Sequence, residues 1–294
     1  MDSLKKSTTA IKAVITVKPK TSIKLDSEND LSLSIEDRRI KESQRRIKER
    51  RFVDRRIFKR RSTENSNIKK ITVVIPALNE EQAIASVIKE IPIIELKTMG
   101  YEVEIMVIDN GSKDKTRYIA DSHLAKVIIQ PIKGYGNAYK AGFANASGNI
   151  IATGDADSTY PFNDLPKIIK KMEDENLDFI TTDRLTNIQP GVMSRSHYFG
   201  NLLLQLMTKI LFGLPIKDSQ SGMWIFKRSI WSKLNVKSSG MPFSQELKIE
   251  AYKKGFKCAE VPIVYRTRVG EVKLSTIKDG IGNILQLIKK RITG

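Results

Sequence analysis

The sequence predicts an α/β fold, in which helices cover both faces of a single, mostly parallel sheet. Short apolar runs, such as residues 71–76, 103–108 and 150–153, indicate buried strands. Helix-like stretches alternate with these runs along the chain, and this alternation is typical of parallel sheets. The chain has 294 residues, of which 40% are hydrophobic, enough for one large domain or two small ones.

The expected elements follow one another in regular order. Pro76 ends the first strand, and Asn79 is expected to cap a helix whose first turn is acidic. Apolar residues spaced three and four apart predict a long helix from Arg195 to about Phe212. The expected strands are 71–76, 103–108, 126–129, 150–153, 177–182 and 257–265, and the expected helices are about 79–91, 113–122, 136–146, 195–212, 245–254 and 276–292.

Polar residues follow three of these strands. Asn79 and Glu80 follow the first, Asp109 the second, and Asp155 and Asp157 the strand 150–153. Ligands of open α/β sheets bind beyond the carboxyl ends of the strands. Two carboxylates at i and i+2 on an extended chain point the same way and could hold one divalent cation. A surface turn would explain this Asp-x-Asp pair equally well by itself, but its place in a series of strand-end clusters favours a metal site.

The positive charge of the chain is concentrated near its N-terminus. The net charge is +18, and residues 38–61 hold 13 basic and three acidic residues, whereas residues 1–37 are neutral overall. We therefore expect residues 1–66 to form a basic extension, partly disordered or helical. Its basic segment suits an anionic lipid surface, although a solvated linker or a nucleic-acid contact would have the same composition. One cysteine excludes an internal disulfide, and two histidines make a multi-histidine zinc site improbable.

No apolar run reaches the roughly 18–20 residues that span a bilayer, so the protein is expected to be soluble or to lie on a membrane surface. Residues 276–294 are expected to form a C-terminal amphipathic helix, packed on the domain or lying on the bilayer, with the bilayer slightly favoured. For the helix 195–212, periodicity alone favours a place in the core.

Six motifs together resemble those of family 2 glycosyltransferases, which have the Rossmann-like GT-A fold. Within that family the chain is most similar to the dolichyl (polyprenyl) phosphate mannosyltransferases and glucosyltransferases. The resemblance covers about 71–275, and we expect residues 67–275 to form the GT-A domain. The motifs are residues 74–81, 107–116, 133–138, 154–157, 218–223 and 265–274.

The resemblance implies a role for most of the strand-end residues. Asp155 and Asp157 would hold Mg²⁺ or Mn²⁺ at the diphosphate, with Asp157 a catalytic residue. Thr159 stands where the mannosyltransferases often have glutamine. Gly134 would allow close backbone approach near the donor, although a helix-capping turn explains it equally well. The residues expected to bind the nucleotide sugar are Pro76, Asn79, Glu80, Asp109, Lys133, Gly134 and Asp155.

The second half of the chain would bind the acceptor. Arginine suits a lipid phosphate because its planar fork bonds two oxygens at once, although Arg195 and Arg268 could be solvated charges. The helix 195–212 would then lie at the membrane interface, and Glu246 stands where inverting relatives carry a base, here in a secondary role. The residues expected to bind the acceptor phosphate are Arg184, Arg195, Gln220, Ser221, Arg266, Arg268 and Lys273.

The implied function is inverting, metal-dependent transfer of a hexose, mannose or glucose, from UDP- or GDP-hexose to dolichyl or polyprenyl phosphate. The product would be a polyprenyl-phosphate sugar for protein or lipid glycosylation. The enzyme would be peripheral on the cytoplasmic face of a membrane, with a possible separate anchor protein and no nucleic acid as a partner. The alternatives are transfer to a hydroxyl of a glycan or glycolipid, or nucleic-acid binding through residues 38–61.

Overall fold

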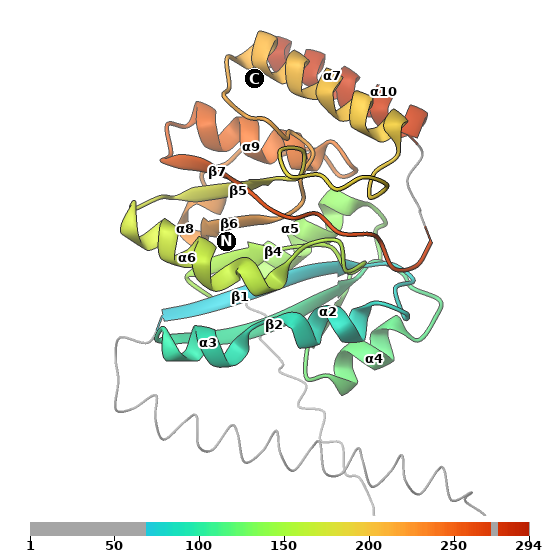
Figure 1. Cartoon of the computed structure of the whole chain (residues 1–294), viewed down its shortest axis with the longest axis vertical. Helices are drawn as coiled ribbons and strands as arrows, with labels where there is room; N and C mark the ends of the chain where they lie inside the picture. The colour runs from blue at the N-terminus through green and yellow to red at the C-terminus, as the bar shows by residue number, and fades with distance from the viewer. Residues whose placement is uncertain (1–68, 272–275, 294) are drawn as a thin grey trace, which may run out of the picture. The chain divides into compact units, whose positions relative to one another are not determined.

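The computed structural model describes residues 69–271 and 276–293. The chain divides into two units, 1–51 and 52–294, and every described residue belongs to the second. The expected N-terminal extension 1–66 and Lys273 lie outside the described residues. The elements (Figure 1) are β1 (Lys69–Ala77), α2 (Ile84–Glu90), α3 (Ile93–Thr98), β2 (Tyr101–Asp109), α4 (Thr116–Ser122), β3 (Lys126–Ile129), α5 (Tyr135–Asn145), β4 (Ile150–Thr153), η1 (Phe162–Asp164), α6 (Leu165–Asp174), β5 (Phe179–Asp183), α7 (Arg195–Phe212), β6 (Trp224–Lys227), α8 (Arg228–Trp231), α9 (Phe243–Lys253), β7 (Cys258–Pro262) and α10 (Thr276–Thr293).

The described strands form one sheet in the order β3-β2-β1-β4-β6-β5-β7. The pairs β1–β2, β1–β4, β2–β3 and β5–β7 are parallel, and β6 is antiparallel to both β4 and β5. The expected single, mostly parallel sheet is therefore confirmed. The antiparallel β6 was not predicted, because its four residues follow a polar loop without an alternating pattern.

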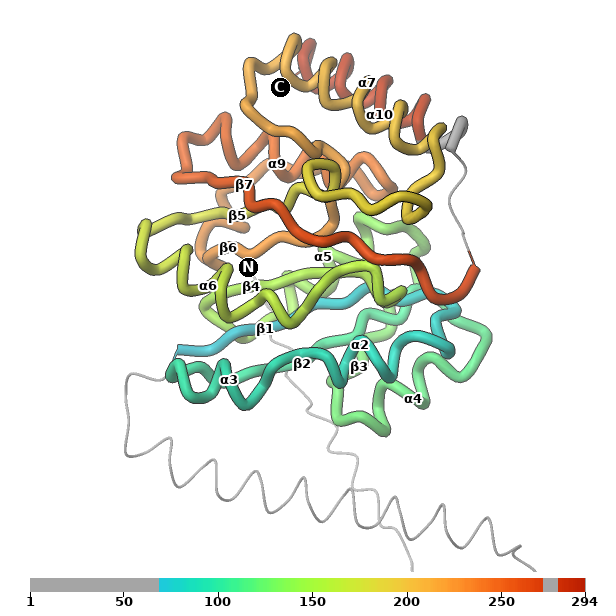
Figure 2. The backbone as a smooth tube through the Cα atoms, in the orientation of Figure 1, coloured from blue at the N-terminus to red at the C-terminus, as the bar shows by residue number. Residues whose placement is uncertain are grey.

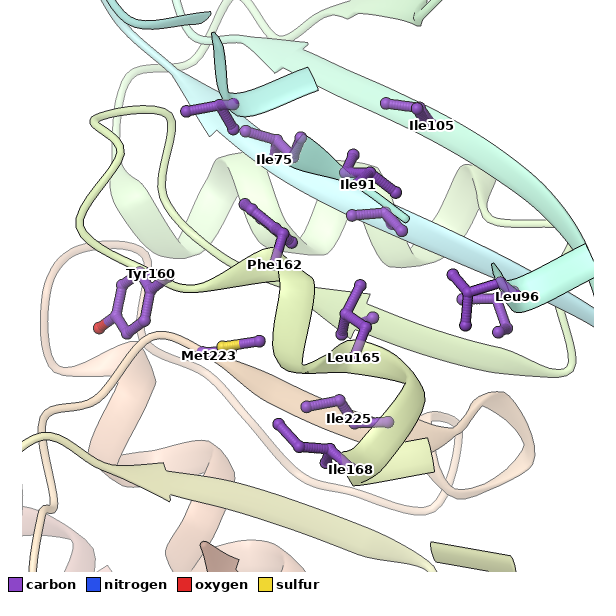
Figure 3. Close-up of a cluster of buried hydrophobic side chains, with 14 of the residues drawn as sticks. Ile75, Ile91, Leu96, Ile105, Tyr160, Phe162, Leu165, Ile168, Met223 and Ile225 are labelled. Carbon is purple, nitrogen blue, oxygen red and sulfur yellow. The ribbon is translucent and has the colours of Figure 1, made fainter. Parts of the chain in front are cut away.

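Helices cover both faces of the sheet, as the sequence predicts. On one face, α2, α3 and α6 pack against inward residues of β1, such as Val73 and Ile75. Figure 3 shows Phe162, Leu165 and Ile168 lying against this cluster, near Ile75 and Ile225. On the other face, α5, α8 and α9 pack against Val74 and its neighbours. The burial of alternate β1 residues in opposite clusters follows from the two-residue period of a strand.

Several boundaries differ from the sequence prediction. The first helix begins at Ile84 instead of Asn79, because Asn79 adopts a positive φ of 52° and residues 81–83 form a turn. Helix α4 likewise begins at Thr116 instead of residue 113. The strand at 126–129 and the helix at 195–212 have the predicted bounds.

Helices α7 and α10 run side by side at one end of the described unit (Figures 1 and 2). They share a small core with α9, in which Leu204, Ile249 and Leu287 are buried. In the described residues, no helix is both long enough and apolar enough to cross a membrane.

Gly142 of α5 tests the packing of this helix on the sheet. A Cβ added there would lie 2.3 Å from Val74 Cγ1, so we expect Gly142→Ala to lower the free energy of unfolding by about 1–3 kcal/mol. Gly282 of α10 is the matched control, because a Cβ there meets no atom within 4 Å. Gly282→Ala should be neutral, or stabilising by up to about 1 kcal/mol, when both variants are measured by urea denaturation. Equal changes in the unfolding free energy of the two variants would contradict the close packing of α5 on Val74.

Candidate active site

The parallel register of β1, β2 and β4 brings three polar loops to one edge of the sheet. Ala77 pairs with Asp109 across β1 and β2, and Val74 pairs with Thr153 across β1 and β4. The residues that follow these strands therefore leave the sheet together, as the sequence predicts.

The loops after β1 and β2 are bonded to one another. The amide of Asn79 donates to Ser112 Oγ at 2.9 Å, and its side-chain Oδ1 accepts from the Lys113 amide at 2.8 Å. The Glu80 amide donates to Thr116 Oγ1 at 2.7 Å. The backbone amide and the side-chain oxygen of Asn79 are both bonded to residues 112 and 113. These two bonds hold Asn79 at its positive φ. The turn is thus preformed next to the edge.

Asp109 is the last residue of β2 and Asn110 follows it, and their side chains have different hydrogen-bond partners. Asp109 is fully buried and accepts from Arg117 Nη2 at 2.6 Å, so the structure pairs it with an arginine that the sequence reasoning did not single out. Asn110 donates to the carbonyls of Gln130 and Ile132, and its Oδ1 accepts from the Gly134 amide at 2.8 Å. Asn110 therefore anchors the 130–134 loop. The signal in the sequence that could indicate this role is an asparagine directly after the aspartate that ends a strand.

Gly134 has a φ of 137° and precedes α5. A Cβ there would lie 2.4 Å from the backbone oxygen of Ser239, and one at Gly136 would lie 2.6 Å from that of Ser238. In this structure these two glycines approach the 235–240 loop closely, and the expected approach of Gly134 to the donor stays a prediction. Lys133 is exposed, and its Cε would lie 3.6 Å from a Cβ at Gly111.

Asp155 lies two residues beyond β4. Its Oδ1 accepts from the hydroxyls of Tyr135 and Tyr139 at 3.2 and 3.3 Å. Burial, and then the neighbouring carboxylate of Asp157, raise the pKa of Asp155 to about 7. The two carboxylates disfavour each other's charge, so a bound cation would stabilise the pair.

Arg268 links Asp157 to Glu80. Its Nη1 donates to Asp157 Oδ2 at 2.7 Å and its Nη2 to Glu80 Oε1 at 2.6 Å. The backbone beside it also pairs with the post-β4 loop, because the Val269 amide donates to the Asp157 carbonyl at 3.0 Å. Figure 2 shows this late segment crossing close to the loop after β4. The expected acceptor residue Arg268 therefore contacts two residues that the sequence assigns to the donor, and the alternative of a solvated charge is wrong.

The carboxylates fit a divalent cation that shares its coordination with a ligand. The Asp157 carboxylate already pairs with a positive group, the Arg268 guanidinium, at 2.7 Å. Among the described residues no group of three or more Asp, Glu, His or Cys could hold a metal by itself. Mg²⁺ is usually bound by one or two carboxylates together with substrate phosphates and water. Thr159 Oγ1 donates to Asp157 Oδ1 at 2.6 Å, so in this structure it orients the aspartate.

A cavity of about 330 Å³ begins at Asp157 and reaches helices α7 and α10. Four polar side chains expected at the acceptor or at the metal line it: Asp157, Arg184, Gln220 and Arg268. Its other walls are mainly apolar or amide-bearing. The remaining lining residues are Thr159, Val192, Met193, Ser194, His197, Gly200, Asn201, Leu204, Met241, Tyr265, Gly280 and Asn283.

Arg184 is held at the wall of this cavity by a buried ion pair. Its Nε and Nη2 donate to the two oxygens of Asp218 at 2.6 and 2.9 Å, and its guanidinium lies 5.2 Å from the centre of the Tyr265 ring. Burial would raise the pKa of Asp218, but Arg184 outweighs it and lowers that pKa to about 2. The arginine is thus fixed in orientation and remains charged.

Among the described residues, three of those expected at the acceptor do not line the cavity: Arg195, Ser221 and Arg266. Ser221 is buried, with its hydroxyl 2.6 Å from that of Thr182. Arg195 is exposed at the start of α7, and Arg266 donates to Glu90 Oε1 at 2.7 Å. Lys273 lies outside the described residues. Arg184, Gln220 and Arg268 are therefore the expected acceptor residues that line the cavity.

Glu246 is buried at the start of α9, and both its oxygens are engaged. Oε2 accepts from the amides of Lys237 and Ser238 at 3.1 and 2.8 Å, and Oε1 accepts from Lys290 Nζ at 3.3 Å. Burial would raise the pKa of Glu246, but these hydrogen bonds and Lys290 lower it. Glu246 does not line the cavity, so its contacts describe a residue that holds a loop, and its role as a base stays a prediction.

Lys248 gives the site a measurable pH dependence. Its buried ammonium donates to the Asp218 carbonyl at 2.7 Å, and burial lowers its pKa to about 8. Between pH 8 and 9.5 the unfolded chain holds a proton that the folded chain has lost, so stability rises with pH. We expect the unfolding free energy of the wild type, relative to Lys248→Met, to rise by about 1–2 kcal/mol from pH 7.5 to 9.5. If urea denaturation gives the same difference in unfolding free energy at both pH values, the lowered pKa of Lys248 is contradicted.

Comparison with known proteins identifies the family. The sequence profile of glycosyl transferase family 2 matches residues 72–234. The low-salt glycan biosynthesis hexosyltransferase Agl6 of Haloferax volcanii is 38% identical over 212 residues, 71% of this chain and 51% of that protein, so the match spans about half of its length. The dolichyl-phosphate hexose transferase of the same organism is 35% identical over 211 residues, 71% of this chain and 89% of that protein.

Solved structures share the fold. Glucosyl-3-phosphoglycerate synthase from Mycobacterium tuberculosis, crystallised with Mn²⁺, UDP-glucose and phosphoglyceric acid, superposes with a TM-score of 0.61 at 22% identity. The superposition covers 76% of this chain and 80% of that one. The expected GT-A fold is confirmed, and the chain belongs to glycosyl transferase family 2.

Proposed function

We propose that this enzyme transfers a hexose, with inversion, from a nucleotide diphosphate sugar, UDP- or GDP-linked, to a dolichyl or other polyprenyl phosphate. The observation that carries the proposal is a cavity lined by both Asp157 and Arg184 and by residues of α7 and α10. The 35% identity to a dolichyl-phosphate hexose transferase supports it. An undecaprenyl-phosphate 4-deoxy-4-formamido-L-arabinose transferase of Salmonella paratyphi B, 34% identical over 149 residues, supports the same class of acceptor.

The donor diphosphate would lie at the carboxyl edge of the sheet. Asp155 and Asp157 would hold Mg²⁺ or Mn²⁺, which would neutralise charge on the departing nucleoside diphosphate. Arg268 lines the same cavity and is already paired with Asp157. A diphosphate would compete with the carboxylates for this guanidinium, because arginine bonds phosphate oxygens in pairs. Donor binding would therefore rearrange the Arg268 pairs.

The acceptor phosphate would lie beside Arg184. An oxygen of the phosphate attacks the anomeric carbon of the hexose, and the bond from that carbon to the nucleotide diphosphate breaks in the same displacement. A phosphomonoester with a second pKa near 6 is already mostly a dianion at pH 7. It needs no base, which agrees with the engagement of both Glu246 oxygens elsewhere. Positioning and charge neutralisation would supply the catalysis.

The alternative acceptor, a hydroxyl of a glycan or glycolipid, would need a base next to the attacking oxygen. Glu246, the residue predicted for that task, is buried outside the cavity wall. The cavity instead offers a fixed arginine, which suits a phosphate. The geometry therefore favours the lipid phosphate. The nucleic-acid alternative depends on residues 38–61, which lie outside the described residues.

Helices α7 and α10 would bring the lipid to the cavity. Counting only side chains that the structure describes, each has four large apolar ones that are between 43% and 79% exposed, a concentration that is unusual on a surface in contact with water only. Exposed basic residues, Lys209, Lys289 and Arg291, accompany them and suit anionic headgroups. The enzyme would thus be peripheral on the cytoplasmic face of a membrane. The apolar residues are Phe199, Leu203, Leu206 and Ile210 of α7 and Ile281, Leu285, Ile288 and Ile292 of α10.

The transfer itself is tested by supplying the purified chain with labelled UDP- and GDP-hexoses, a polyprenyl phosphate and Mg²⁺ or Mn²⁺. We expect a labelled sugar phospholipid, and Asp157→Ala should lower its rate at least about 100-fold, because one preorganised electrostatic contact is lost. Asp174→Ala, in an exposed i,i+4 pair with Lys170, is the control and should keep its rate. No product from any donor would refute the proposal.

The apolar face is tested by sedimentation with anionic vesicles at high salt, where attraction by basic segments is screened. The double variant Ile210→Glu with Leu285→Glu should weaken vesicle binding at least tenfold, since each buried apolar side chain contributes about 1.5–3 kcal/mol. Ile94→Glu, at an apolar site on α3 that is even more exposed than Ile210 or Leu285, should bind as the wild type does. Unchanged binding of the double variant would exclude this face.

A further inference from the structure

The 235–240 loop lies between α10 and the beginning of α5, and it contacts both. Towards α5, the carbonyl of Ser239 accepts from the Asn137 amide at 3.1 Å. The glycines at 134 and 136 leave no room between loop and helix, because a Cβ at either would come within 2.6 Å of a loop carbonyl. A displacement of the loop would therefore displace the start of α5.

Two carboxylates of α9 hold this loop through its backbone amides. Glu246 Oε2 accepts from Lys237 and Ser238, and Glu250 Oε2 accepts from Asn235 at 2.9 Å. Both glutamates are buried and lie one helical turn apart. Like charges at this spacing repel each other, and burial increases the cost. The arrangement needs a cation.

Lys290 of α10 supplies that cation. Its Nζ is 2.7 Å from Glu250 Oε1 and 3.3 Å from Glu246 Oε1, and it also donates to the Asn235 carbonyl at 3.1 Å. Lys290 is buried, in contrast to its neighbour Lys289, which is exposed. One lysine of α10 therefore contacts both loop-holding carboxylates and the loop itself.

The start of α5 continues this chain of contacts to the predicted metal site. The Gly134 amide donates to Asn110 Oδ1, and the Tyr135 hydroxyl donates to Asp155 Oδ1. Each step from Lys290 to Asp155 is thus a hydrogen bond, an ion pair or a close steric contact.

We propose that Lys290 is a positioning residue, which sets the geometry of the nucleotide-diphosphate site through the 235–240 loop and the start of α5. The inference rests on the donor half of the proposed function and extends it, since it makes α10 a determinant of nucleotide affinity. Loss of Lys290 would leave Glu246 and Glu250 buried without their cation, and the loop would shift to relieve them. By linkage, nucleotide binding would in turn stabilise the contacts of Lys290 with Glu246 and Glu250.

The test measures the affinity of the full chain for UDP and GDP in the presence of Mn²⁺, by calorimetry and without acceptor. Lys290→Met should raise the Kd of the nucleotide that the wild type binds at least fivefold, and the KM for the nucleotide sugar by a similar factor, with a smaller effect on kcat. The matched control, Lys289→Met on the same helix, should stay within twofold. Urea denaturation gives the folded fraction, to which each Kd is referred.

Glu246→Gln serves as a second variant should Lys290→Met not fold. Its amide oxygen can still accept from the loop amides while the charge pair is lost, so its Kd should rise in the same direction by a smaller factor. When Lys290→Met and Glu246→Gln are combined, their effects on the Kd should be less than additive, because both act through the Lys290–Glu246 contact. A wild-type Kd in folded Lys290→Met and in Glu246→Gln would overturn the inference, as would a wild type that binds neither nucleotide. Nucleotide binding without sugar transfer would refute the proposed function alone.

Discussion

The parallel register of β2, β1 and β4 is the constraint on which the site depends. It ends three strands at one edge, so Asn79 with Glu80, Asp109 with Asn110, and Asp155 with Asp157 emerge as neighbours from distant parts of the sequence. Arg268 then closes the group by pairing Asp157 with Glu80. The sheet fixes the backbone from which each loop leaves. Burial, and then the neighbouring carboxylate of Asp157, raise the pKa of Asp155 at this edge.

The site divides into a sheet-built half and a helix-built half. The first consists of loops that bond to one another through backbone amides. The second consists of the walls contributed by α7 and α10. Arg184, which directly follows β5 and is fixed by Asp218, faces the same cavity. The loop at 235–240 connects the two halves, since Glu246 and Lys290 hold it from the helical side and Gly134 meets it from the other.

The sequence could predict the sheet because buried parallel strands are short apolar runs, and β3 and β4 were found with their bounds. It also predicted the strand-end clusters, because topology alone decides which loops meet. It could not predict ion-pair partners that depend on long-range packing. Arg268 therefore appeared as an acceptor residue, although it contacts Asp157 and Glu80, and Ser221 as a ligand, although it is buried beside Thr182. The role of Glu246 in holding a loop depends on Lys290, 44 residues later.

The most direct test is a crystal structure of the chain with Mn²⁺ and the nucleoside diphosphate it binds, with the metal located by its anomalous signal. The account predicts a manganese peak beside the Asp157 carboxylate, with the diphosphate in the cavity and Arg268 moved from its present pairs. A peak elsewhere, or a nucleotide bound outside the cavity while Arg268 still joins Asp157 to Glu80, would contradict it.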